Sequence, residues 1–322
     1  MLNILVLLCG GTIGSRSEHG KISLAEGGTL SVIENYNKTH SGVSFTVKDA
    51  SPISSEEIDD KFYLLLINFF KSFDLSGFDG VIITHGTDTL SFTAPLFSFA
   101  CRDVRIPVIF VSASYVPDDV RSNAHRNFGD AVSIIKNGIK GIFSVSDGEA
   151  VFAPRLCEAD WLSNRFTSFD GTPILNVEND KITVNNRELL KAVNEFQAKG
   201  IPINSLDNKI LLITPYPGID YSCFDLSAVS AVLHMTYHSA TASSNGLKLF
   251  IEKCRSLGKN FYIAPIKTGD MYDSTAKILE YGAIPMYKIS HEAALAKLKI
   301  AYNCDGEQRG EILNSNLYFE HI

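Results

Sequence analysis

One stretch constrains the fold more than any other: residues 80–90, which read Gly-Val-Ile-Ile-Thr-His-Gly-Thr-Asp-Thr-Leu. Its first half is a short β-branched run between two glycines, a pattern typical of a buried strand in a parallel sheet. Helical spacing of apolar residues follows it. We therefore expect Thr87 and Asp88 between the carboxyl end of a strand and the start of a helix, where open α/β sheets bind ligands. In the alternative interpretation, Thr87 or Thr89 only caps the helix.

The rest of the chain extends this pattern over two domains. Strands alternate with helical segments through the first half, which predicts a parallel sheet with helices on both faces. A chain of 322 residues is long for one core, so we expect two domains. We predict a larger N-terminal domain over residues 1–196, a linker over 197–208 that contains Gly and Pro, and a smaller C-terminal α/β domain over 209–322.

Four local predictions accompany this architecture. The polar, glycine-containing segment 15–28 is typical of a mobile loop. The sequence Asp-Ala-Ser-Pro at 49–52 predicts a turn, and the serines and glutamates at 54–57 predict the start of a helix. A further helix is expected near 224–229.

Composition excludes several classes of function. The net charge is −7 and the pI is near 5.6, so there is no general attraction to nucleic acid or to an anionic membrane. Six scattered cysteines lack metal-ligand spacing and suit reduced thiols in a cytoplasmic protein. The apolar run 2–9 reads as a core strand rather than a signal peptide, and no apolar run is long enough to span a membrane. We expect a small-molecule ligand and neither a metal nor a cofactor.

Small hydroxyl side chains follow three of the predicted strands: Thr12, Ser51 and Thr87. If these loops meet at one edge of the sheet, they form a pocket with two candidate nucleophiles, which need a base to become reactive. Asp88 is suited to hold a ligand ammonium, and Ser51 with loop amides to bind a carboxylate. Such a pocket fits a small amino acid that carries an amide. A dinucleotide site is the distant alternative, because residues 10–14 lack the Gly-x-Gly-x-x-Gly pattern.

Residues 10–14 (Gly-Gly-Thr-Ile-Gly) and 84–89 (Thr-His-Gly-Thr-Asp-Thr) resemble the two signature motifs of the bacterial-type L-asparaginase family, in the right order and separation. The cytoplasmic type I branch is the most similar. Weaker matches lie at 120–127, 166–168, 216–218 and 292–298.

The resemblance implies a hydrolase that removes the side-chain amide of asparagine through a covalent acyl-enzyme, without a metal, in a homodimer or homotetramer. Thr12 matches the attacking nucleophile and Thr87 the second catalytic threonine. Asp88 matches the group that grips the substrate α-amine, and Ser51 the group that contacts its α-carboxylate. Gly86 belongs to the same substrate-binding loop, whose amides would stabilise the oxyanion.

Three positions depart from the family pattern. The family's lysine near the second threonine is matched by Cys157 or Glu158, and no lysine occurs from 142 to 180. The lid tyrosine aligns with Lys21, and an Asp-Gly pair becomes Asn123-Ala124. Losing one general base typically costs about a hundredfold to ten-thousandfold in rate.

Replacement bases are present in the sequence. Lys21 is the candidate base for Thr12 in a closed site, and Glu158 for Thr87. Cys157 is a weaker candidate as a new nucleophile, because no histidine lies near it in sequence. Two hypotheses follow: an amidohydrolase that acts on asparagine or a related amide, and a catalytically impaired asparaginase-like protein that binds an amino acid or a partner as a sensor or subunit.

Overall fold

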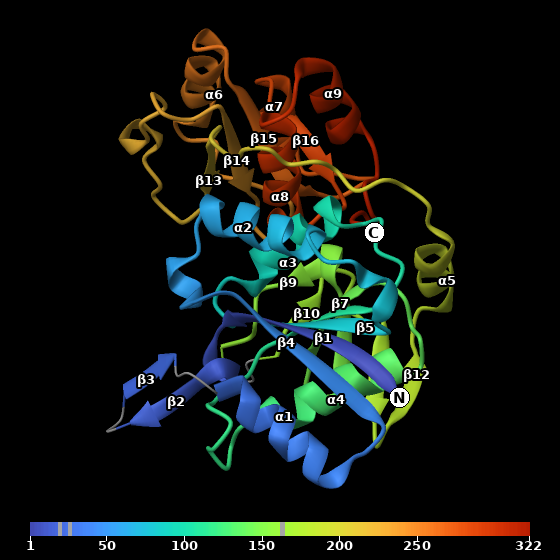
Figure 1. Ribbon diagram of the computed structural model, residues 1–322. Coiled ribbons are helices and arrows are strands. Elements are labelled where there is room, and N and C mark those ends of the chain that lie inside the picture. The colour runs from blue at the N-terminus through green and yellow to red at the C-terminus, as the bar shows by residue number, and fades with distance from the viewer. Residues whose placement is uncertain (19–20, 25–27, 162–164) are drawn as a thin grey trace. The chain divides into compact units, whose positions relative to one another are not determined.

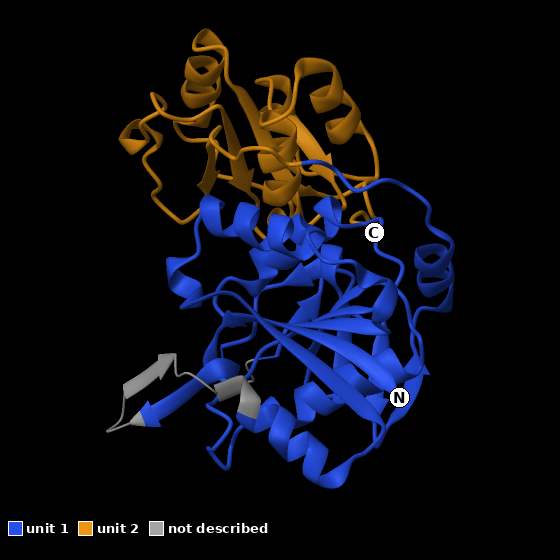
Figure 2. Cartoon of the chain, in the orientation of Figure 1, with its two compact units in different colours: residues 1–202 blue, residues 203–322 orange. Residues whose placement is uncertain are grey.

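A computed structural model describes residues 1–18, 21–24, 28–161 and 165–322. The chain divides into two compact units, Met1–Pro202 and Ile203–Ile322, which Figure 2 colours separately. The division lies within the segment 197–208 that the sequence marks as a connection. Each unit has its own α/β architecture, and the predicted fold class is confirmed.

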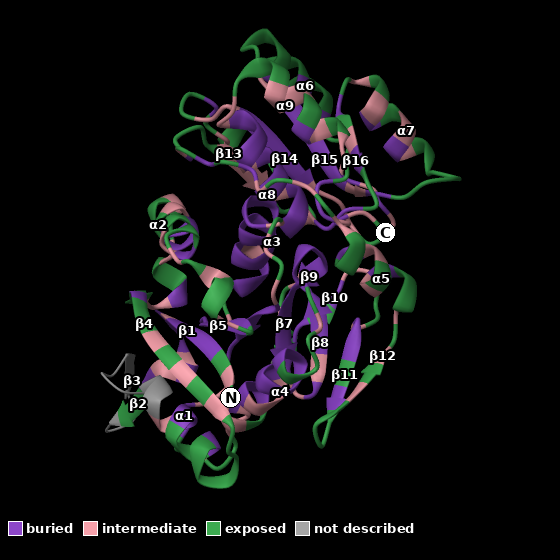
Figure 3. Cartoon of the chain, turned by 45° about the vertical axis from the view of Figure 1, so that its right-hand side comes forward, coloured by how far each residue is buried: buried purple, intermediate pink, exposed green. Residues whose placement is uncertain are grey.

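Unit 1 is built on an eight-stranded sheet with the strand order β12-β11-β8-β7-β6-β5-β1-β4. Its parallel strands are β1 (Leu2–Gly10), β4 (Val43–Ile53), β5 (Gly80–Thr84), β6 (Val108–Val111) and β7 (Ile142–Ser146). Three antiparallel strands continue the sheet: β8 (Glu149–Phe152), β11 (Leu175–Glu178) and β12 (Lys181–Val184). Figure 3 shows that β5 and β7 are buried throughout, whereas the edge strands β4 and β12 alternate between buried or half-buried and exposed positions.

Helices cover both faces of this sheet (Figure 1). One pair, α1 (Gly28–Thr39) and α4 (Ala124–Lys136), packs together on one face. The other pair, α2 (Asp60–Lys71) and α3 (Leu90–Ala100), packs together on the opposite face. The helix α5 (Arg187–Glu195) follows the last strand.

Two small antiparallel pairs stand outside the large sheet. Strands β2 (Ser15–Glu18) and β3 (Lys21–Leu24) pair within the segment predicted as a mobile loop, so that prediction is wrong for these residues. Residues 19–20 and 25–27 of the segment lie outside the described residues. The second pair is β9 (Leu156–Cys157) with β10 (Thr167–Ser168).

Unit 2 has a four-stranded parallel sheet with the order β13-β14-β15-β16. Its strands are β13 (Ile210–Ile213), β14 (Ala231–Met235), β15 (Asn260–Ile266) and β16 (Ile284–Tyr287), and its helices are α6 (Leu247–Ser256), α7 (Asp273–Glu280), α8 (His291–Tyr302) and α9 (Gly306–Asn314). An apolar cluster that includes Val232, Phe250 and Ile263 forms a core of its own. No helix in the described part of the chain is long and apolar enough to cross a membrane.

Three further local predictions are corrected. The turn expected at 49–52 lies inside β4, because the chain makes a bulge there instead of reversing direction. A 3-10 turn, Ser55–Glu57, lies where the helix was expected to begin, and the α-helix α2 begins at Asp60, where the Asp59 carboxylate accepts the N–H groups of residues 61 and 62. The segment 224–229 is not helical. There the Asp225 side chain accepts hydrogen bonds from the N–H and Oγ of Ser227, a local turn that competes with a helix.

Unit 2 contains a buried ion pair. Lys297 on α8 and Glu320 near the C-terminus are almost fully buried, and Nζ lies 2.9 Å from Oε1. Burial raises the pKa of Glu320, but a hydrogen bond from His321, the Lys297 charge and the backbone N–H groups of Leu317 and Tyr318 outweigh it and lower the pKa to about 2.

Unit 1 contains a carboxyl group whose pKa is raised rather than lowered. Asp130 on α4 is mostly buried, and its Oδ2 lies 3.7 Å from the Nε of Arg126. Burial raises the pKa of Asp130 to about 6, against the lowering effect of Arg126. Asp130 therefore carries a proton over a pH range in which an exposed aspartate is ionised.

Candidate active site

The two signature segments lie side by side because they follow neighbouring parallel strands. Strands β1 and β5 are paired in register from Ile4 opposite Gly80 to Leu8 opposite Thr84. The Cys9 N–H also donates to Thr84 Oγ1 over 3.3 Å. Their carboxyl ends therefore meet at one edge of the sheet, and residues 10–14 and 85–89 begin there.

A close backbone contact joins these two loops. Gly11 has a φ of +82°, and a Cβ placed on it would lie 2.4 Å from the carbonyl carbon and oxygen of His85 and from the nitrogen of Gly86. Only glycine fits there, because both the conformation and the space exclude a side chain. The segment that carries Thr12 is thereby held against the segment that carries Thr87. Both threonines are half-buried.

Thr12 begins a single 3-10 turn, Thr12–Gly14. The Ser15 hydroxyl donates to the Gly11 carbonyl over 3.0 Å, and the Gly14 N–H donates to the same oxygen over 2.9 Å. These two bonds fix the Gly11 carbonyl and close the turn. Thr12 is therefore presented by a short, internally bonded loop.

Asp88 is exposed and is held by Ser55, which begins the 3-10 turn Ser55–Glu57 just after β4. Ser55 is buried, and its Oγ donates to Asp88 Oδ2 over 3.2 Å. The Ser55 carbonyl accepts a hydrogen bond from Thr89 Oγ1 over 2.9 Å, so the contact has two points of attachment. Gly86 leaves room for this serine, since a Cβ on Gly86 would lie 2.4 Å from Ser55 Cβ and Oγ.

Ser51, the expected carboxylate contact, lies in a different setting. It is exposed, has a φ of +61°, and sits in the β4 bulge opposite the register shift between Leu8 and Gly10. The serine that bonds Asp88 is Ser55, which sequence reasoning assigned only to a helix start. The available signal was the Ser54-Ser55 pair, which follows the predicted turn at 49–52.

His85 lies under the loop and is fully buried. Its ring contacts Phe62 and Phe110 edge-on, with centroids 6.2 Å away in each case. Its Nδ1 lies 2.8 Å from the Gly86 carbonyl oxygen. Burial lowers the pKa of His85 to about 4, so the imidazole is neutral at physiological pH.

The positions that depart from the family pattern are only partly described. Lys21 begins β3, but its side chain lies outside the described residues. Glu158 is exposed and directly follows β9, and Cys157 is half-buried with Sγ 3.8 Å from the Arg155 carbonyl. The turn before β9 packs against α3, the helix that follows Thr87 and Asp88. Arg155 in this turn is tied to Asp170 over 2.8 Å.

Asn123 connects two neighbouring loops at the same edge. Its Oδ1 accepts the Ser114 N–H over 2.9 Å, and its Nδ2 donates to Asp147 Oδ2 over 3.1 Å. An ionised aspartate has no proton to donate to Asp147. An ionised aspartate in place of Asn123 could not make this link in the same way.

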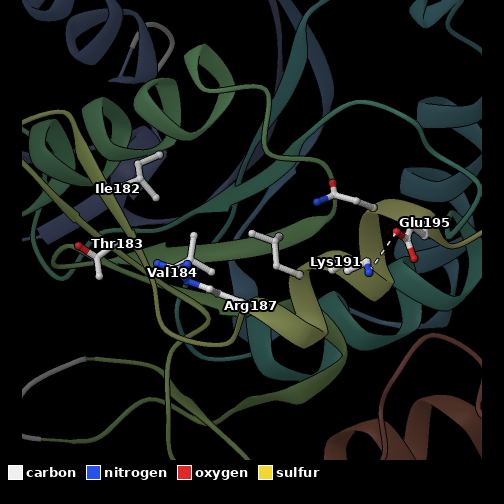
Figure 4. Close-up of a pocket in the computed structure, with 8 residues that line it drawn as sticks. Ile182, Thr183, Val184, Arg187, Lys191 and Glu195 are labelled. Atoms are coloured by element: carbon white, nitrogen blue, oxygen red, sulfur yellow. Dashed lines mark ion pairs between the residues drawn. The ribbon is translucent and has the colours of Figure 1, made fainter.

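A hollow of about 630 Å³ lies elsewhere in unit 1, between β12 and α5 (Figure 4). Ile182 and Val184 of the strand line it, together with Arg187 and the Lys191–Glu195 ion pair of the helix. Strand β12 is five strands from β5, or about 24 Å at the usual strand spacing. We therefore place the candidate active site at the strand-end loops. The described residues include no group of three or more His, Cys, Asp or Glu suited to hold a metal.

Known proteins resemble this chain along most of its length. The chain is 25% identical over 332 aligned residues to the L-asparaginase of Thermococcus kodakarensis, with 98% of each protein covered. It is 28% identical over 230 residues to one subunit of a glutamyl-tRNA(Gln) amidotransferase from Methanococcus vannielii. That match covers 68% of this chain and about half, 53%, of the relative.

A solved structure of the thermostable L-asparaginase from Thermococcus kodakarensis has the same fold. It superposes with a TM-score of 0.83 at 23% sequence identity, and the match covers 100% of this chain and 99% of that one. The family model described as "Asparaginase, N-terminal" matches residues 3–190, which include both signature loops. The chain therefore belongs to the asparaginase family of amidohydrolases.

Proposed function

We propose that the protein hydrolyses the side-chain amide of L-asparagine, or of a related amide, to the acid and ammonia through a threonine acyl-enzyme. The observation that carries the proposal is the backbone contact of Gly11 with residues 85–86. It holds the Thr12 loop beside the Thr87 loop, with the Asp88 carboxylate at the same edge. Two hydroxyls and an anchored carboxylate are the groups needed to bind an amino acid and attack its amide.

In the proposed reaction the Thr12 hydroxyl attacks the amide carbon and the amide nitrogen leaves as ammonia, after which water releases the acid. Thr87 is the second catalytic threonine. Asp88, held by Ser55, binds the substrate ammonium, because a carboxylate fixed by a hydrogen bond is pre-organised for a charged partner. Gly86 and its neighbours supply backbone N–H groups. Ser51 keeps its proposed role as a carboxylate contact, and Ser55 is a rival for it.

Lys21 and Glu158 are proposed as the bases that replace the family's tyrosine and lysine. Both residues belong to segments connected to the site. Lys21 begins β3, which pairs with β2, the strand that follows the Thr12 loop. Glu158 follows β9, and the turn before β9 packs against α3. At position 158 the anionic Glu158 stands in place of a cationic lysine. At position 21 the cationic Lys21 stands in place of a neutral tyrosine. We therefore expect a substrate preference that differs from simple asparagine.

The test is ammonia release from asparagine, glutamine and N-substituted asparagines by the full chain, with Thr12→Ala and Thr87→Ala beside the wild type. Thr183→Ala is the matched control, because Thr183 is exposed on the distant edge strand β12. Loss of turnover in both site variants, with the control unchanged, supports the proposal. Turnover that survives in either site variant refutes the assigned roles.

The second candidate is a catalytically impaired protein that binds an amino acid or a partner subunit. It is favoured by the departures at Lys21 and Glu158 and by the likeness to a protein named as one subunit of an amidotransferase. This candidate predicts no ammonia release, but thermal stabilisation by aspartate that Asp88→Ala removes. We also propose a homodimer or homotetramer. A cytoplasmic location is proposed as well, supported by six cysteines that are all free.

A further inference from the structure

His85 has an arrangement that its burial alone does not explain. The ring is fully buried between Phe62 and Phe110, and within the described residues its Nε2 has no hydrogen-bond partner. A buried acceptor without a donor destabilises the folded state. An apolar side chain of similar size would avoid that cost, so the histidine requires another explanation.

The other ring nitrogen supplies it. Nδ1 lies 2.8 Å from the Gly86 carbonyl oxygen, which can only accept, so Nδ1 must carry the proton of the neutral ring. The Phe62 and Phe110 contacts fix the plane of the ring. His85 thus holds the Gly86 carbonyl in one direction, toward the core.

The direction of that carbonyl sets the direction of a neighbouring N–H group. The peptide bond between Gly86 and Thr87 is trans, and the C=O and N–H of a trans peptide point to opposite sides. With the Gly86 oxygen turned toward the buried ring, the Thr87 N–H points away from it. Thr87 is half-buried and Asp88 is exposed, so solvent reaches this loop. The Thr87 N–H makes no hydrogen bond within the part of the chain that the structure describes.

We propose that His85 is a positioning residue that aims the Thr87 N–H at the substrate carbonyl oxygen, where it stabilises the oxyanion of the acyl-transfer step. This inference rests on the proposed amidohydrolase function and adds one device to it. The imidazole takes no part in proton transfer. Its proton stays on Nδ1, and its effect reaches the substrate only through the peptide plane.

The experiment compares three variants that separate the contribution of Nδ1 from that of Nε2. The Asn side chain places an N–H near the position of Nδ1, the Gln side chain places one near Nε2, and Leu supplies neither. We expect His85→Leu and His85→Gln to lower kcat by about a hundredfold with KM nearly unchanged, as the loss of one oxyanion donor does. His85→Asn should keep most of the wild-type kcat. His85→Leu removes the unpaired Nε2 but leaves the Gly86 carbonyl without its donor, so its melting temperature should lie close to that of the wild type.

The outcomes separate the inference from the function on which it rests. If all three variants have the kcat of the wild type, the role of His85 is overturned and the hydrolase function stands. An equal loss in all three, with lower melting temperatures, also overturns it, since it shows a purely structural role. If the wild type releases no ammonia, crystal structures of the wild type and of His85→Leu decide. A Gly86–Thr87 peptide that rotates in the variant supports the positioning of this peptide by His85, and one that stays in place overturns it.

Discussion

Replacing Glu320 by glutamine should destabilise unit 2 at neutral pH by about 3 kcal/mol. The pKa of Glu320 falls from an ordinary 4.5 to about 2, and that difference converts to about 3 kcal/mol of stability. Removing one partner of a buried pair costs about 3–5 kcal/mol in other proteins, because the remaining charge stays buried. Both routes give the same order of magnitude, since Lys297 has almost no access to solvent.

The sign of the pH dependence follows from the lowered pKa. The contribution of Glu320 is complete above its ordinary pKa of 4.5 and is lost as the pH falls through about 2. Urea unfolding followed by circular dichroism at pH 7, and at steps below pH 4.5, measures the effect. The difference between wild type and Glu320→Gln should narrow as the solution becomes more acidic.

Two companion variants test the reasoning. The exposed pair of Lys248 and Glu252 has its charges 3.9 Å apart, and Glu252→Gln should cost less than about 0.5 kcal/mol. The double variant Lys297→Met with Glu320→Gln should recover most of the lost stability, because no buried charge is then left without a partner. A loss below about 1 kcal/mol for Glu320→Gln at pH 7, or a loss that does not vary with pH, would show that the pair is not desolvated as described.

Three other predictions concern unit 1. Gly11→Ala should abolish turnover and lower the melting temperature, because its Cβ would overlap the backbone of residues 85–86; a variant with wild-type kinetics would contradict the close contact. Ser55→Ala should raise the KM for an amino-acid substrate about tenfold or less with a smaller change in kcat, since Asp88 loses one charge-assisted hydrogen bond; steady-state kinetics decides. Asp130→Asn should raise the melting temperature at pH 7.5 and change it little at pH 4. Burial raises the pKa of Asp130 to about 6, so ionising this carboxyl group above that pH costs stability. Equal shifts of the melting temperature at both pH values would refute this.

Much of the fold could be predicted because the deciding signals are local. The buried β5 strand is bounded by glycine and by the Thr-Asp loop, as its sequence predicts. The parallel arrangement of the central strands in each sheet could be predicted from the alternation of strands and helices along the chain. Other elements carried weak signals: the short strand β16 and the helix α9, whose apolar periodicity is low, were absent from the prediction.

The site was only partly predictable, because its geometry depends on contacts distant in sequence. That the segment carrying Thr12 lies beside the segment carrying Thr87 followed from their shared position after strands. The choice of Ser55 over Ser51 beside Asp88 did not, since it depends on a bulge that appears only when β4 is paired with β1. The buried ring of His85 was also out of reach, because its neighbours come from α2 and β6.

The glycine contact between the two signature loops has a consequence for redesign. The threonine loops are held together by main chain against main chain, at Gly11 and residues 85–86, rather than by the side chains that surround them. Substitutions of side chains near the threonines should therefore leave the relative position of the two loops unchanged. We therefore expect that lysine at position 158 or tyrosine at position 21 can be introduced one at a time without disturbing the contact of Gly11 with residues 85–86.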